Sequence, residues 1–203
     1  FARDGRIFTA LVEVTEDEDW NTPMDRDDRA QYQLVAADVT DLTAPGFYPL
    51  RDIRGSLEGV TPAPHLLVTR EVDGGPEEAF HRLHLYSWMD GVVQALDAFI
   101  VPDGLLVDTV VTAAHVQRLI WDDTREQFAL RLLPLDAAGF GTPGEALWLP
   151  AGVPQAWRDE MWEGQPCYTL HPAPADGHLI VQDVCTLAVY GLQAEADDSL
   201  RVV

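Results

Sequence analysis

The central stretch from Phe80 to Leu133 constrains the fold more than any other part of this chain. Its apolar runs are separated by Asp90-Gly91, by Pro102-Asp103-Gly104 and by Asp122-Asp123-Thr124. Such groups between apolar runs are turn signals, because glycine accepts a positive φ and aspartate hydrogen-bonds the neighbouring backbone. The stretch therefore predicts an up-and-down antiparallel meander.

A helical hairpin over residues 88–121 is the alternative for part of this stretch. Val92, Leu96 and Phe99 are spaced as on one face of a helix, and Ser87 with Asp90 fits a capping box. Short apolar runs do not distinguish a helix from a strand by period alone. The segment 107–112, rich in valine and threonine, favours strands.

The flanking segments add further strands. Residues 6–14 alternate between apolar and other positions, and similar runs lie at 31–40, 65–72, 167–171 and 179–192. A short helix is expected over 154–163, with proline at its start and glycine just past its end. We therefore predict a β-rich α+β fold of one domain over residues 1–203. Its antiparallel meander sheet would form a sandwich or open barrel with one short helix.

The late hairpin makes a specific register prediction. A turn centred on Asp176 places Cys167 and Cys185 opposite one another, or one step apart, on adjacent strands. We expect thiols if the protein is cytoplasmic and a disulfide if it is exported.

The charge of the chain limits its partners. It has 34 acidic and 13 basic residues, a net charge of −21, and every basic residue is arginine. The acidic residues are spread along the chain rather than held in a tail, and such a field opposes contact with nucleic acid or an anionic membrane. No apolar run is long enough to span a membrane, and the chain does not start like a signal peptide. We expect a soluble, cytoplasmic, lysine-free acidic protein with a basic protein partner, for which a homo-oligomer is also possible.

One constellation has the spacing of a metal site. Glu78, His81 and His84 follow one another at intervals of three, which on a helix would place them on one face. On the strand that we favour, His81 and His84 point to opposite faces and cannot bind the same ion. The acidic run at 15–29 lacks the glycine that a calcium loop needs. We therefore predict no metal site and no cofactor, and no catalytic residue.

The segment 154–163 is the predicted interaction site. Tryptophan and methionine are favoured at the centres of protein interfaces, where buried aromatic side chains contribute most of the affinity. The anchor would be Trp157, Met161 and Trp162, and the charged rim Asp159, Glu160 and Glu163.

We accordingly expect a non-enzymatic interaction protein, such as an inhibitor, an immunity-type protein or an assembly component. One alternative is a metal-dependent hydrolase that uses His81, His84 and Glu78. Another is a structural subunit of a particle or surface assembly.

Overall fold

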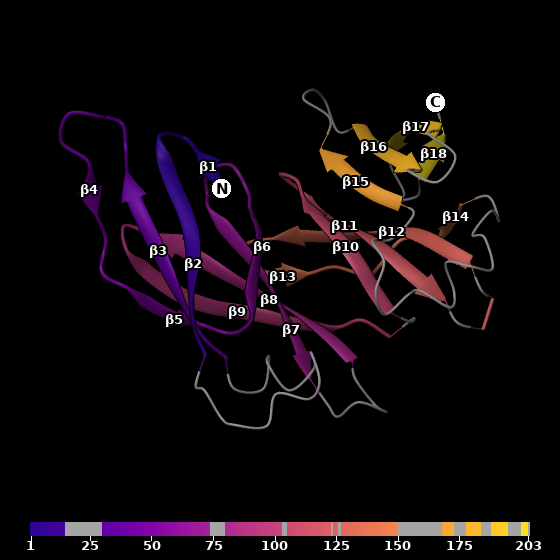
Figure 1. Ribbon diagram of the computed structural model, residues 1–203, viewed down its shortest axis with the longest axis horizontal. Helices are drawn as coiled ribbons and strands as arrows, with labels where there is room; N and C mark the ends of the chain where they lie inside the picture. The colour runs from indigo at the N-terminus through magenta and orange to yellow at the C-terminus, as the bar shows by residue number, and fades with distance from the viewer. Residues whose placement is uncertain are drawn as a thin grey trace. The chain divides into compact units, whose positions relative to one another are not determined.

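The structure is β-rich throughout the part of the chain that it describes. The computed structural model describes residues 1–14, 30–73, 80–102, 105–122, 124–125, 127–149, 168–172, 178–183, 188–194 and 200–202. In these ranges every regular element is a strand, and every strand pairing is antiparallel (Figure 1). The helix predicted at 154–163 lies outside the described residues.

The chain divides into two compact units. Unit 1 comprises Phe1–Pro102 and Leu135–Phe140, and unit 2 comprises Asp103–Pro134 and Gly141–Val203. The single domain over residues 1–203 therefore stays a prediction, and each unit is described by itself.

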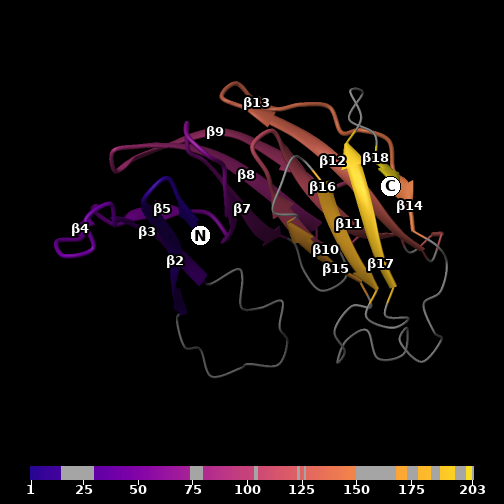
Figure 2. The ribbon, with the colours of Figure 1, turned by 90° about the horizontal axis from the view of Figure 1, so that it is seen from above.

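Unit 1 contains two antiparallel sheets, which we call the first and second sheets. The first sheet has the order β1-β2-β3-β4, with β5 also paired to β3, and the second has the order β6-β7-β8-β9. Figure 1 labels all of these strands, and Figure 2 shows β2 to β5 and β7 to β9 from a second direction. The strands of the first sheet are β1 (Ala2–Arg3), β2 (Arg6–Val14), β3 (Ala30–Asp38), β4 (Gly46–Phe47) and β5 (Arg51–Ile53). Those of the second are β6 (Ser56–Val60), β7 (Leu66–Asp73), β8 (Phe80–Met89) and β9 (Val92–Ile100).

The core of unit 1 lies between these two sheets. Phe8, on β2, is fully buried and meets Trp88, on β8, edge to face with ring centroids 5.1 Å apart. Tyr48 meets the same indole from another side at 5.0 Å. Edge-to-face aromatic pairs add stabilisation beyond the burial of their area. The buried residues of this cluster come from β2, β3, β5, β6, β7 and β8: Phe8, Leu34, Ala36, Ile53, Val60, Leu67, Tyr86 and Trp88.

The hairpin β8–β9 settles the helix-or-strand alternative over 88–121 in favour of strands. Asp90 and Gly91 both have positive φ, at 48° and 83°, as expected for a two-residue turn of the Asp-Gly type. Leu85 pairs with Asp97 and Tyr86 with Ala95, so β9 contains a bulge between these pairs. The prediction of a strand pair joined by Asp90-Gly91 is confirmed.

The predicted meander is nevertheless interrupted. β9 belongs to the second sheet, whereas β10 (Leu105–Val111) pairs with β11 (His115–Asp122) in a different sheet. Pro102-Asp103-Gly104 therefore does not join two paired strands, and the boundary between the two units falls after Pro102. A turn signal shows that regular pairing stops, but it does not show which strands pair on either side.

Unit 2 contains the sheet that begins with β10 and a further four-stranded sheet. β11 pairs with β12 (Gln127–Asp136), which also pairs with β14 (Leu147–Trp148), while β13 (Gly139–Phe140) pairs with the end of β12 that belongs to unit 1. The further sheet has the order β15 (Tyr168–Pro172), β16 (His178–Asp183), β17 (Ala188–Ala194) and β18 (Leu200–Val202).

The late hairpin is present as β15 and β16. Tyr168 pairs with Asp183 and Pro172 with Leu179. The predicted partners Cys167 and Cys185 lie just outside the described residues, so their pairing stays a prediction.

Candidate functional site

The residues predicted from sequence to form a site have different outcomes. The anchor and rim at 157–163 lie outside the described residues, and so does Glu78. His81 and His84 both lie on β8, three residues apart, so their side chains point to opposite faces of the second sheet. Within the described ranges, no group of three histidine, cysteine, aspartate or glutamate side chains is placed to hold a metal ion.

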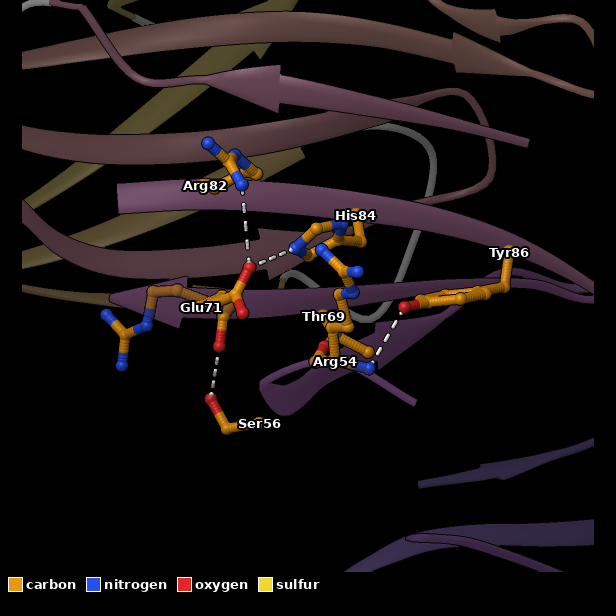
Figure 3. Close-up of polar contacts among 8 residues, drawn as sticks. Arg54, Ser56, Thr69, Glu71, Arg82, His84 and Tyr86 are labelled. Carbon is orange, nitrogen blue, oxygen red and sulfur yellow. Dashed lines mark hydrogen bonds and ion pairs between the residues drawn. The ribbon is translucent and has the colours of Figure 1, made fainter. Parts of the chain in front are cut away.

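The structure instead pairs His84 with a residue that the sequence did not single out. His84 Nε2 lies 2.7 Å from Glu71 Oε2 across the β7–β8 pair, and only 7% of His84 is exposed (Figure 3). Arg82 Nη1 lies 3.9 Å from the same carboxylate oxygen. Glu71 thus has one oxygen fixed by a buried imidazole and a nearby guanidinium, both provided by β8. Charge-assisted contacts of this kind are the stronger ones in proteins and hold a carboxylate in one orientation.

The turn between β5 and β6 is held against these residues. The backbone N–H of Arg54 donates to the Tyr86 hydroxyl at 3.0 Å, and the Thr69 hydroxyl donates to the Arg54 carbonyl. Gly55 follows with a φ of +73°, and a Cβ there would lie 2.1 Å from the carbonyl oxygen of Arg70. Only glycine fits this close approach, so the backbone of the turn is fixed on β7 and β8.

Burial also changes the acidity of the tyrosine in this cluster. Desolvation raises the pKa of the Tyr86 hydroxyl above its ordinary value, and the hydrogen bond from the Arg54 N–H opposes this shift in part. Tyr86 therefore remains a neutral hydroxyl over the physiological range. In Figure 3 the Arg54 side chain lies on the same side of the sheet as Glu71 and His84.

A pocket of about 330 Å³ opens beside this cluster. Glu71, Arg54 and Gly55 line it together with residues of the first sheet, namely Gln31, Tyr32 and Asp52. Asp52 is itself oriented, because its Oδ1 accepts a hydrogen bond from Gln33 Nε2 at 3.1 Å. We call this the Glu71 pocket. It combines hydrogen-bond donors, acceptors and one aromatic ring on a fixed backbone.

A second candidate site is the face of the first sheet that points away from the core. Residues directly paired across antiparallel strands point to the same face. The register pairs Ile7 with Ala37 and Ala37 with Phe47, which makes one row across β2, β3 and β4. Further rows are Thr9 with Val35, and Leu11 with Gln33 and Asp52. These positions alternate with the buried Phe8, Leu34 and Ala36, so they form the outer face of the sheet.

This outer face exposes several large apolar side chains. The exposed fractions are 43% for Ile7, 52% for Leu11 and 75% for Phe47. Solvent-facing positions of a two-faced antiparallel sheet are ordinarily polar. The charged residues on this face among the described strands are Glu13 and Asp52, both acidic, and no arginine occupies a position on it. An apolar surface bordered by acidic groups is typical of a protein interaction site.

Two further carboxylates lie near the β3–β4 end of this sheet. Hydrogen bonds from the hydroxyl and backbone N–H of Thr40 lower the pKa of Asp38. The corresponding groups of Thr43 lower the pKa of Asp41. Asp38 is partly exposed and Asp41 exposed, and both stay ionised, so they add to the negative charge beside Phe47.

The sequence contains a signal for the apolar side chains of the outer face. Residues 7–12 read Ile-Phe-Thr-Ala-Leu-Val, so both alternating sets of positions contain large apolar residues. A strand with one solvated face has an apolar set and a polar set. The Glu71–His84 contact had no such signal, because it joins residues 13 apart through the β7–β8 register.

Comparison of the sequence with protein-family models and with curated proteins found no match. Among the described residues, no helix is long and apolar enough to cross a membrane.

Proposed function

We propose that this protein is a non-enzymatic acidic interaction module that binds a basic protein partner through the outer face of its first sheet. The observation that carries the proposal is the set of exposed apolar side chains Ile7, Leu11 and Phe47 on a face whose charged positions are all acidic in the described strands. Burial of these side chains against a partner would provide the central affinity.

Charge decides which kind of partner fits. Glu13 and Asp52 lie on the face itself, and Asp38 and Asp41 lie near its β3–β4 end. The chain as a whole has a net charge of −21. A second copy would bring like charges together, which opposes association, whereas a partner with an apolar centre and a basic rim is attracted. The occupant is therefore a basic protein.

The experiment compares matched variants in capture from the native host, followed by binding to the purified captured protein. Phe47→Ser and Leu11→Ser remove apolar contact on the outer face without adding charge. Val92→Ser, at an exposed position on β9 that is 61% exposed, is the control for a lost surface apolar group elsewhere. Circular dichroism verifies that each variant is folded.

The expected result is a basic protein that the wild type and Val92→Ser capture and that the outer-face variants lose. Association with that purified protein should slow as salt rises, because attraction between opposite charges accelerates encounter and salt screens it. An acidic partner, or equal capture by all variants, would contradict the proposal.

The predicted anchor of Trp157, Met161 and Trp162 stays a separate prediction. If it contributes to the same interface, Trp162→Ala should raise the dissociation rate of the captured partner, and Glu160→Arg should mainly slow its association. Unchanged kinetics for both variants would leave the outer face as the binding surface without that segment.

A further inference from the structure

We propose that the Glu71 pocket binds a neutral, polyhydroxylated ring of the monosaccharide class. Asp52 belongs to both the outer face and the pocket, but Ile7, Leu11 and Phe47 do not line the pocket. The proposal therefore does not depend on the proposed interaction function. It is argued from the size of the pocket, its balance of charge, its hydrogen-bonding groups and the rigidity of its backbone.

The size fits one sugar ring. Pockets that bind drug-sized ligands have volumes of about 300–1,000 Å³. At about 330 Å³ the Glu71 pocket lies at the lower end. A single six-membered ring with its hydroxyl groups fits such a volume, whereas a nucleotide or a longer chain would extend out of it.

The charges around the pocket balance. Asp52 and Glu71 contribute two negative charges to its lining, and Arg54 contributes one positive charge. Arg82 adds a second positive charge behind Glu71, with its Nη1 3.9 Å from Glu71 Oε2. An anion or a cation would each meet two like charges here, and a neutral ligand meets neither penalty.

The polar groups match vicinal hydroxyls, each of which both donates and accepts a hydrogen bond. The carboxylates of Asp52 and Glu71 can accept from hydroxyl groups, while the Arg54 guanidinium and the Gln31 amide can donate to them. Tyr32 provides an aromatic ring against which the C–H groups of a sugar can pack. Donors, acceptors and an aromatic ring in one lining suit a ligand that is polar at its edges and apolar on its face.

The site is already formed without a ligand. His84 fixes the orientation of Glu71 at 2.7 Å, Gln33 fixes that of Asp52 at 3.1 Å, and Tyr86 and Thr69 hold the backbone of Arg54. Binding then costs little ordering entropy, which raises affinity for a small ligand.

The test uses methyl α-D-glucopyranoside, methyl α-D-galactopyranoside and methyl α-D-mannopyranoside with the full chain. Saturation-transfer difference NMR reports contact with the glycoside, and amide chemical shifts of ¹⁵N-labelled protein locate it. We expect saturation transfer to at least one glycoside, with shift changes at Tyr32, Asp52, Arg54 and Glu71. Glu71→Gln should weaken binding by about tenfold or more, because it removes a charged acceptor.

Glu58→Gln is the matched control. It removes the same charge from the same sheet at a residue that contacts Arg70 at 3.2 Å and does not line the pocket. If Glu71→Gln disturbs the fold, Asp52→Asn tests the opposite wall at an exposed position. Phe47→Ser should bind the glycoside as the wild type does, which separates this test from that of the proposed function.

Absence of saturation transfer for all three glycosides would overturn the proposal. So would glycoside binding that Glu71→Gln and Asp52→Asn leave unchanged, or shift changes confined to residues away from the pocket. Pocket shifts produced by acetate or methylguanidinium, but by none of the glycosides, would assign the pocket to a charged ligand and would also overturn it.

Discussion

The two faces of the first sheet come from the same strands and both carry large apolar side chains, yet these side chains are buried mainly on one face. Phe8, Leu34 and Ala36 on the inner face are at most 2% exposed, whereas Ile7 and Leu11 on the outer face are about half exposed. Residue type is similar on the two faces, so it does not explain the difference. The inner face is covered by the second sheet of unit 1. The comparison shows that the burial of an apolar side chain depends on how the layers pack.

The largest expected effect on stability comes from truncating one apolar side chain on each face of the first sheet. Phe8→Ala should lower the free energy of unfolding by about 3–5 kcal/mol, because it leaves a cavity among fully packed rings. Leu11→Ala, on the same strand, should change it by about 0.5 kcal/mol or less. Urea denaturation measures both. A similar loss for the two variants would mean that the outer face is packed in solution.

The next test concerns the backbone that joins the two sheets. Gly55→Ala should lower the free energy of unfolding by about 2–3 kcal/mol, since its Cβ would meet the Arg70 carbonyl and its φ is positive. Gly46→Ala, on β4 of the exposed edge, is the control, because its nearest neighbour is the Asp38 Cβ at 3.9 Å. Equal urea midpoints for the two variants would contradict the fixed turn.

A smaller effect on the free energy of unfolding is expected from removal of the Tyr86 hydroxyl. Tyr86→Phe should cost about 1 kcal/mol at neutral pH, because the Arg54 N–H loses its acceptor. The raised pKa of Tyr86 means that the folded state keeps this proton when the unfolded chain has released it. Wild-type stability should therefore fall as pH rises above the ordinary tyrosine pKa of about 10.

This loss of stability at alkaline pH should be absent in Tyr86→Phe. Urea denaturation at a series of pH values from neutral to alkaline measures the difference between the two proteins. A difference that does not narrow with rising pH would show that the Tyr86 hydroxyl is not protected by burial.

The smallest effect on stability is expected for a substitution at Phe47 on the outer face. Phe47→Ser should leave the free energy of unfolding within about 0.5 kcal/mol of the wild type, because the ring is largely exposed. The same variant should lose the basic partner. A substantial loss of stability would instead assign Phe47 to the core of the chain itself.

The sequence predicted strands better than it predicted sheets. Asp90-Gly91 joins β8 and β9 as expected, because the positive φ of both residues is a local property. Pro102-Asp103-Gly104 is similar in sequence and predicts one more turn of a continuous meander. In the structure β9 and β10 belong to different sheets. Local turn chemistry is the same in both cases, and only long-range pairing separates them.

The spacing of His81 and His84 shows the same limit of prediction from sequence, here for contacts between side chains. Once residues 80–89 form a strand, His81 and His84 must point to opposite faces, so the sequence and the period of a strand determine that they cannot share an ion. The partner of His84 is another matter. Glu71 meets it because β7 and β8 pair in a register that sets Thr69 opposite His84 and Arg82 opposite Glu71.

By itself, the sequence determined the antiparallel β character of the described strands, the position of the main hairpin and the net acidity of the chain. These depend on alternation, turn residues and composition, all of which are local or additive. Only the tertiary structure decided which apolar face is covered and which polar groups meet in the Glu71 pocket. Both depend on register and on layer packing between segments far apart in the chain, and no local pattern encodes them.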